Sequence, residues 1–173
     1  QGKMGTYSTE VLDEALIDNI VDTIIESAKF IDSPDEAIIY AGDKEYHELN
    51  DLYNEDLFNI DVAKKIETVK ALDSLLHKGD PHVTIVETMY DEQTKSVMLQ
   101  NTKGLKLYNK VNSSMIGGSV IVKNENDQRT GFDLLLSNDF NDYNIEKLAS
   151  TIVGDAVKTL GAKPIPSGQY EIV

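Results

Sequence analysis

Three histidines are the residues best suited to binding a metal ion, because the imidazole nitrogen is a common zinc ligand. They are His47, His77 and His82. None belongs to a His-Glu-x-x-His arrangement, in which two histidines lie one helical turn apart beside a carboxylate. His77 and His82 flank a Gly-Asp-Pro turn and could approach each other, but two ligands are too few for a zinc site. We therefore expect a helix-terminal and a strand-initial histidine, and no metal ligand.

A nucleophilic serine or cysteine would need to be held at a strained turn beside a base. The chain has no cysteine, which also excludes disulfides and thiolate metal sites and fits a reducing compartment. Gly117-Gly118-Ser119 lies inside an apolar run, not in a Gly-x-Ser-x-Gly elbow. Adjacent glycines in a strand indicate a bulge or a close approach of a helix or backbone; a ligand using the same gap is the lesser alternative.

Phosphate and calcium binding find little support. No Gly-x-Gly-x-x-Gly or Gly-x-x-x-x-Gly-Lys-Ser/Thr run occurs, so a nucleotide-binding loop is not predicted. Polar residues gather between positions 50 and 56, as Asn50, Asp51, Asn54, Glu55 and Asp56. They lack the glycine and the alternating spacing of a calcium loop, which favours a solvated loop. We predict no catalytic, cofactor-binding or metal-binding residue in this chain.

The negative charge is concentrated in one stretch. The formal net charge is −14, and residues 10–61 carry all of the excess, with Lys29 and Lys44 as their only basic residues. Such a surface repels phosphate backbones, so we expect no direct nucleic-acid binding. The simplest interpretation is that the acids solvate helix faces and loops. Binding to a basic protein, as a mimic of DNA, stays open as an alternative.

Three amphipathic helices are predicted from apolar residues that recur every three or four positions. They cover residues 10–31, residues 59 or 61 to about 76, and residues 144–160. Ser8 and Thr9 are the expected caps of the first helix. Gly79 and Pro81 are expected to end the second, and Gly161 follows the third.

Between the second and third helices the apolar period changes to two, which indicates strands. The expected strands cover residues 82–90, 96–101, 105–111, 115–123 and 130–137. Turn residues separate them at 91–94, 101–104 and 124–127, and Gly104 can take a positive φ. Short links imply antiparallel neighbours. The predicted fold class is α+β, an antiparallel β-meander of four to five strands packed with about three amphipathic helices.

Residues 32–59 are acidic and without a sustained period, so we expect a long connection with short local turns, in which residues 37–40 are a candidate for a short strand. Connections this long usually serve a function or pack onto something else. We predict an α+β domain over residues 1–163, followed over 164–173 by a proline-stiffened linker and the first strand of another domain. Because the chain starts at Gln1 and ends in a strand-like run, we interpret it as the middle part of a longer protein.

Three stretches, taken in order, resemble the PmbA branch of the TldD/PmbA family, whose members carry the label modulator of DNA gyrase and are linked to proteolysis and peptide maturation. The first is Gly-Lys-Met-Gly-Thr-Tyr-Ser-Thr-Glu at 2–10. The second is Asn-Thr-Lys-Gly-Leu at 101–105, with the strand around 119–122. The third, at 154–170, is the most specific, because a helix, Leu-Gly-Ala, proline and Ser-Gly-x-Tyr occur together there.

The resemblance implies a subunit of a zinc metallopeptidase complex. TldD-type members carry a His-Glu-x-x-x-His zinc motif in a later domain, and nothing here matches it. The resemblance therefore implies that zinc is held only by a TldD-type partner, and that this chain contains no cofactor. The expected partners are a TldD-type subunit, or further copies of the full-length parent, and an extended peptide substrate.

The function predicted from the sequence is that of a non-catalytic part of a PmbA-like subunit, acting in proteolysis and peptide maturation. No apolar run is long enough for a membrane span and no secretory signal is visible, so we expect a cytoplasmic protein without a membrane partner. The alternative is an acidic module that binds a basic partner. A self-contained hydrolase is the least supported hypothesis, because no motif supplies its machinery.

Overall fold

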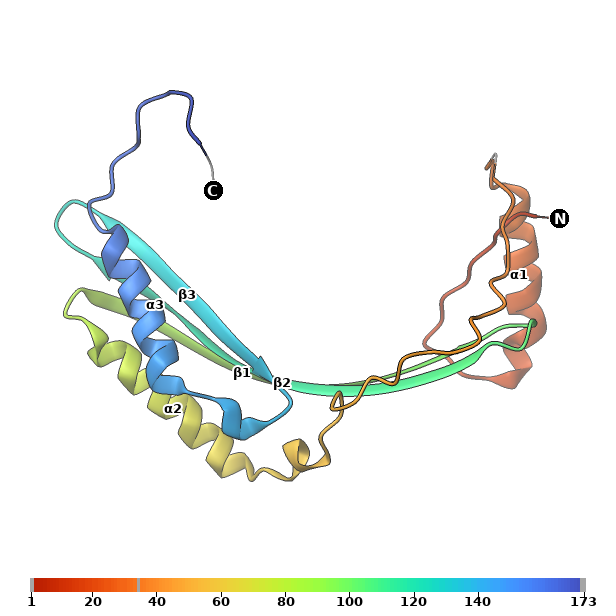
Figure 1. Ribbon diagram of the computed structural model, residues 1–173, viewed down its shortest axis with the longest axis horizontal. Helices are drawn as coiled ribbons and strands as arrows, with labels where there is room; N and C mark the ends of the chain where they lie inside the picture. Colours follow the sequence, from red (N-terminus) through yellow and green to blue (C-terminus); the bar gives the residue numbers. More distant parts are fainter. Residues whose placement is uncertain (1, 34, 172–173) are drawn as a thin grey trace. The chain divides into compact units, whose positions relative to one another are not determined.

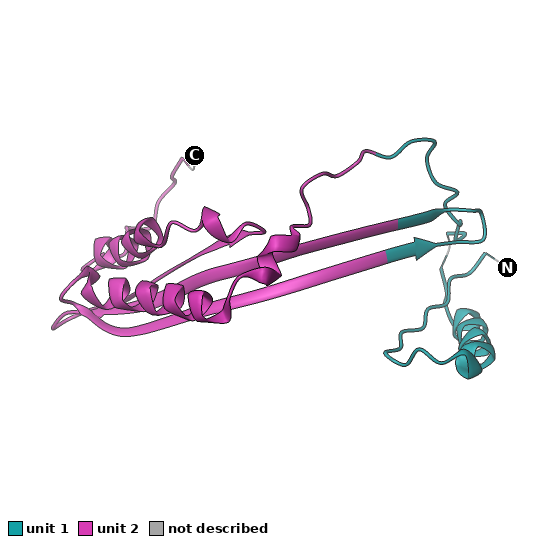
Figure 2. Ribbon diagram, turned by 90° about the horizontal axis from the view of Figure 1, so that it is seen from below, with its two compact units in different colours: residues 1–46, 98–107 teal, residues 47–97, 108–173 magenta. Residues whose placement is uncertain are grey.

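The computed structural model describes residues 2–33 and 35–171, which fall into two compact units. One unit comprises residues 1–46 with 98–107, and the other residues 47–97 with 108–173 (Figure 2). None of the helices in the described residues is long and apolar enough to cross a membrane.

The larger unit is built on a three-stranded sheet (Figure 1). Its strands are β1 (Val83–Gln100), β2 (Lys106–Lys123) and β3 (Gln128–Ser137), in the order β1-β2-β3. The last residues of β1 and the first of β2, within 98–107, are counted with the smaller unit. β2 and β3 pair antiparallel from Ser114↔Ser137 to Lys123↔Gln128. The α+β class is confirmed, whereas the prediction of four to five strands was wrong.

The count differs because two expected breaks lie inside continuous strands. Residues 91–94 have turn chemistry but belong to β1, and residues 112–114 belong to β2. Polar side chains there bond across the ladder, as where Gln93 Nε2 donates to Ser113 Oγ over 3.3 Å. Strand pairing thus overrides the local turn preference. The turn at 101–104 is confirmed, with Gly104 at φ 92° and its N–H donating to the Asn101 carbonyl.

Two helices cover one face of this sheet, α2 (Val62–Gly79) and α3 (Ile145–Thr159) (Figure 1). Asp61 caps α2 by accepting from the N–H of Ala63, and Asn144 caps α3 by accepting from that of Lys147. Such caps satisfy amide groups that have no partner within the helix. The second and third predicted helices are therefore confirmed, with small shifts of their ends.

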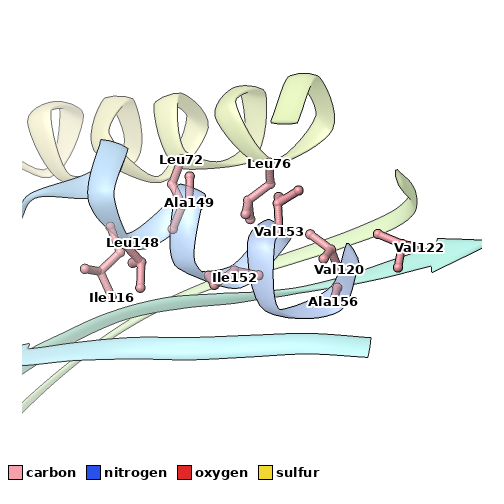
Figure 3. Close-up of a cluster of buried hydrophobic side chains, with 10 residues drawn as sticks. All are labelled: Leu72, Leu76, Ile116, Val120, Val122, Leu148, Ala149, Ile152, Val153 and Ala156. Atoms are coloured by element: carbon pink, nitrogen blue, oxygen red, sulfur yellow. The ribbon is translucent and has the colours of Figure 1, made fainter. Parts of the chain in front are cut away.

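The core lies between these helices and the sheet (Figure 3). Its buried side chains are Leu72, Leu76, Ile116, Val120, Val122, Leu148, Ala149, Ile152, Val153 and Ala156. Gly118 faces α2 so closely that a Cβ there would lie 2.9 Å from Cδ1 of Leu76. Gly118 thus marks a close approach of helix and sheet, and Gly117 marks a close approach of the neighbouring strand at Leu134; both fit the interpretation that the sequence favoured.

The C-terminal end of α3 is tied to the turn between β2 and β3. Gly161 has φ 78°, and its N–H donates to Oδ2 of Asp127 over 2.7 Å. Arg129 pairs with the same carboxylate and donates Nε–H to the Thr159 carbonyl. The Gly161 bond, followed by the Gln128 N–H and the Arg129 charge, lowers the pKa of the Asp127 carboxyl. A carboxylate therefore holds the end of the helix against the sheet.

The replacement Asp127→Asn is expected to lower the thermal unfolding midpoint near neutral pH. The difference in midpoint from wild type is expected to shrink as the pH is lowered. Folding lowers the pKa of Asp127, so the ionised carboxylate stabilises the fold at pH values above the ordinary aspartate pKa of about 4. This contribution is lost as the pH falls through the lower pKa of the folded state. Circular dichroism melts of both proteins from about pH 7 to about pH 2.5 measure it. A difference in midpoint independent of pH would contradict this role.

The smaller unit contains α1 (Ile17–Lys29), preceded by a 3₁₀ turn at Glu14–Leu16. The expected start at Glu10 with a Ser8 or Thr9 cap was wrong, because Asp13 caps the turn by accepting from the N–H of Ala15. Thr9 instead closes a local turn with Val11.

The long connection is confirmed in its main feature, since its described residues hold one short 3₁₀ turn, Glu55–Asn59, and no strand. The strand expected at 37–40 is therefore wrong. The Tyr40 carbonyl bonds to the side chain of Asn101 instead of joining a ladder. The strand expected at the C-terminal end reaches residues 172 and 173, which lie outside the described residues.

Candidate functional site

The three histidines, His47, His77 and His82, are all exposed. His77 is in the last turn of α2, where Nδ1 lies 3.0 Å from the Asp73 carbonyl oxygen. His82 immediately precedes β1, and its Nδ1 lies 2.7 Å from Oδ1 of Asp80. Bonds from His82 lower the pKa of the Asp80 carboxyl. Within residues 2–33 and 35–171, no three potential ligands come together as a metal site requires.

The polar loop at 50–56 is partly attached to the sheet and is not simply solvated. Asn54 caps the turn at Glu55–Asn59 by accepting from the N–H of Asp56, and its Nδ2 donates to the Asn138 carbonyl over 2.9 Å. Asn138 in turn donates to the carbonyl of Asp51, whose φ is 61°. The side-chain oxygen of Asn54 therefore serves the backbone, and the described acids of this loop form no group that could hold a metal ion.

Asn112 of β2 is the residue that holds this loop, and its side chain is only 5% exposed. Its Oδ1 accepts from the N–H of Asn54 over 2.9 Å, and its Nδ2 donates to the Asn54 carbonyl over 2.7 Å. Its backbone N–H donates to the Leu52 carbonyl. Since the β3 ladder stops at Ser114, residues 52–54 continue the pairing of β2 beyond the end of β3.

Next to this loop is a half-buried polar cluster. Lys65 Nζ lies 2.5 Å from Oε1 of Glu92, with the two side chains 12% and 18% exposed. The Tyr90 hydroxyl donates to the same Glu92 oxygen over 2.6 Å. The hydroxyls of Ser114 and Tyr143 are 2.6 Å apart. Elements α2, β1 and β2 thus each contribute a polar group to one small region.

The protonation states and hydrogen bonds of this cluster do not favour a catalytic role for its side chains. Burial, with the Glu92 bond as a second cause, raises the pKa of the Tyr90 hydroxyl, and burial also raises that of Tyr143. Both phenols therefore stay protonated near neutral pH. Lys65 is already paired, and Ser114 is fully buried with its hydroxyl bonded. An activated nucleophile needs an available base beside it, which this arrangement does not provide.

A groove of about 420 Å³ borders the cluster. Its walls come from α2 and β1 and consist of Val62, Lys65, Ile66, Val69, Lys70 and Tyr90. The ring of Phe140 packs edge-on against the ring of Tyr90, with 6.1 Å between their centroids. The walls are almost wholly apolar, so the groove suits an apolar side chain.

No feature of the sequence identified this cluster. Lys65, Glu92 and Ser114 are far apart along the chain, and each type is common on surfaces. The strand expected at residues 82–90 included Tyr90, but Glu92 lay in the turn expected at 91–94, so the sequence did not bring the two together. The residues singled out in the sequence, the histidines and Ser119, lie outside it.

Residues 55–160 match a family model described as the PmbA/TldA metallopeptidase central domain. The chain belongs to the PmbA/TldD family. The match covers more than half of the chain and includes β1, β2, β3, α2 and α3, and therefore both the polar cluster and the groove. The resemblance inferred from the sequence is confirmed. Of its three stretches, the one at 2–10 lies outside the matched range and the one at 154–170 lies partly inside it.

Solved structures of putative modulators of DNA gyrase have the same fold. The protein from Thermotoga maritima is 24% identical with a TM-score of 0.77, over 96% of this chain and 37% of that one. The protein from Bacteroides thetaiotaomicron is 20% identical with a TM-score of 0.83, over 98% and 40%. TldE from Thermococcus kodakarensis is 14% identical with a TM-score of 0.64, over 90% and 35%.

This PmbA/TldD-family chain therefore spans well under half the length of these solved relatives. A comparison with curated proteins finds no match. The cluster and groove belong to the central domain of the family, and the remaining parts of the relatives have no counterpart in this chain.

Proposed function

We propose that this chain is part of a non-catalytic, PmbA-like subunit of a cytoplasmic zinc metallopeptidase complex that acts in proteolysis and peptide maturation. The observation that carries the proposal is the match of residues 55–160 to the central domain of this metallopeptidase family. In this proposal a TldD-type subunit holds the zinc ion and cleaves the peptide. The PmbA-like subunit forms part of the chamber wall.

The site geometry supports a role in binding a peptide more than a role in cleaving it. The polar groups of the cluster bond to one another, which leaves the groove as the surface open to a ligand. An unfolded peptide presents apolar side chains, and the groove offers almost wholly apolar walls to receive one.

Binding of a basic protein is the second candidate function, favoured by one arrangement in α1 and the turn before it. Glu14, Asp18, Asp22 and Glu26 recur every four residues and are all exposed. Residues four apart in a helix lie on one side, roughly 6 Å from each other. They form a single acidic row, whereas a mimic of duplex DNA needs two, and Lys29 pairs with Glu26. The peptidase-subunit proposal therefore stands first.

A peptidase assay on an unfolded peptide with added Zn²⁺ tests the proposal. The samples are this chain, the full-length parent, a full-length TldD-type partner, and the last two together. We expect cleavage by the mixture of parent and partner and none by this chain, because none of its described side chains is arranged as a hydrolytic site. Zinc-dependent cleavage by this chain alone would overturn the proposal and direct attention to His47, His77 and His82.

A further inference from the structure

Residues 51–54, which we call the strap, lie along β2 beyond the end of β3 without forming a regular strand. A backbone bond joins them to β2, where the N–H of Asn112 donates to the Leu52 carbonyl over 3.1 Å. At Asn54 the partner is instead a side chain, because the Asn112 carboxamide accepts from the N–H of Asn54 and donates to its carbonyl. The strap therefore takes the position of a neighbouring strand but is held in part by a side chain of β2.

The Asn112 carboxamide recognises backbone atoms of the strap. A carboxamide offers an acceptor oxygen and a donor NH₂ group, as a peptide unit offers one acceptor and one donor. In an extended chain the N–H and C=O of one residue point to the same side, so both can bond to such a partner at once. These two bonds do not depend on the side chain of residue 54. Any extended peptide would bring the same two groups to Asn112.

The other contacts that hold the strap are polar, and its first residue has an unfavourable backbone conformation. Asn138 Nδ2 donates to the Asp51 carbonyl over 2.6 Å, and Lys110 Nζ lies 3.7 Å from the centroid of the Tyr53 ring. Asp51 has φ 61°, a region that side chains other than glycine disfavour. Asp51 is exposed and residues 52–54 are only partly buried. Departure of the strap would therefore relieve strain and uncover little apolar surface.

The chain on either side of the strap allows it to leave while the core stays in place. Residues 47–50 are exposed and belong to no helix or strand, so they supply slack before the strap. Leu57, at 1% exposure, anchors the turn Glu55–Asn59 that follows. Segments with few buried apolar contacts open locally at a lower cost than the core. The strap has the features of such a segment.

We propose that the strap is detachable and that an extended peptide can take its place along β2, with the Asn112 carboxamide bound to the peptide backbone. This rests on the function proposed above, because a peptide-handling subunit meets such a ligand. The bonds that the strap gives up are those that the peptide makes, so the exchange is nearly balanced. The closed strap lowers the apparent affinity for peptide by the fraction of molecules in which it is open. It thus acts as a built-in competitor.

Hydrogen exchange of the full chain, resolved by residue, is the first measurement. The probe is a short peptide of alternating serine and valine. When it binds, the Asn54 amide is expected to exchange faster, because it loses the Asn112 oxygen. The Asn112 amide should stay protected, because a peptide carbonyl replaces that of Leu52. The same peptide N-methylated at alternate residues lacks the donors and is expected to change neither amide.

Variants that loosen the strap without altering Asn112 are expected to bind the peptide more tightly. Tyr53→Ala removes the contact with Lys110, and Asn138→Ala removes the donor to Asp51. Each should raise the affinity about two- to fivefold, measured by the fluorescence anisotropy of a labelled peptide. The matched controls are expected to leave it unchanged. They are Tyr108→Ala, whose hydroxyl bonds to Ser96, and Asn141→Ala, whose side chain bonds to Asp139.

The groove beside α2 provides the test between two binding places. Ile66→Glu lies in that groove and is expected to leave the response of the Asn54 amide unchanged. Peptide binding that keeps the Asn54 amide protected and is lost in Ile66→Glu would assign the peptide to the groove and overturn the strap proposal alone. Equal affinity in wild type and both strap variants, or no binding by them at about 1 mM peptide, would also overturn it. None of these measurements uses a peptidase assay, so failure of the subunit proposal is seen separately.

Discussion

Replacing Gly131 by alanine is expected to destabilise the larger unit by about 2–3 kcal/mol. Gly131 lies in β3 directly beneath α3. A Cβ there would overlap the carbonyl oxygen of Ile152 and lie 3.0 Å from Cβ of Ala156. A backbone oxygen cannot rotate away as a side chain can, so α3 would have to move off the sheet and loosen the core that both elements share. Urea denaturation monitored by circular dichroism measures the effect.

Gly154 provides the matched control, because it is a glycine of α3 itself. A Cβ at Gly154 would meet no atom within 4 Å. Gly154→Ala is therefore expected to raise stability by about 0.5–1 kcal/mol, since alanine restricts the unfolded chain and favours the helix. A lower free energy of unfolding for Gly131→Ala and a higher one for Gly154→Ala would establish the close approach of β3 and α3. Stabilisation by both would show that the helix accommodates a methyl group at Gly131.

Periodicity predicted α2 and α3 because burial of one face holds each of them, whereas α1 has the same apolar period but no buried residue. The stripe of α3 runs through Leu148, Ile152 and Ala156, and all three are buried as the spacing indicated. The start of the first helix was wrong for a local reason. Ser8, Thr9 and Asp13 can all cap, and the sequence does not show which one will be at the end of the hydrogen-bonded turns.

The strand count could not be predicted from local residue types. Asp91 to Thr94 favours a turn in an isolated chain, but β2 offers this segment a ladder of backbone bonds. The choice between a turn and a continued strand depends on a partner more than ten residues away in sequence. The hairpin at Gly104 was predictable, because a positive φ there is a property of the residue itself.

The candidate site was missed for a related reason. Its chemistry lies in pairs that are distant in sequence, such as Lys65 with Glu92 and Ser114 with Tyr143. Each pair forms because helix α2 and the turn after β3 pack on the same sheet. Sequence motifs find sites whose residues are close together along the chain, and in this cluster only Tyr90 and Glu92 are such neighbours. Family resemblance was the stronger guide, because it uses the whole order of segments and not one spacing.

The replacement Asn112→Ala is expected to destabilise the larger unit by about 2–4 kcal/mol, because the N–H and the carbonyl of Asn54 would both lose their partner in a nearly buried place. Hydrogen exchange should show faster opening of residues 52–54 than of the core. Asn141→Ala is the matched control, because Asn141 is exposed and its side chain bonds only to neighbouring Asp139. A loss of stability equal to that of the control would contradict the role of Asn112.

A second variant separates this two-bond arrangement from simple loss of packing. In Asn112→Asp the retained oxygen can still accept from the N–H of Asn54, but an ionised carboxylate cannot donate to the Asn54 carbonyl. Burial beside a carbonyl favours the neutral acid, which raises its pKa. Protonation at acidic pH restores the missing donor, so the loss of stability relative to wild type should shrink as the pH falls. If packing alone mattered, Asn112→Asp would lose almost no stability at any pH, because asparagine and aspartate have nearly the same volume.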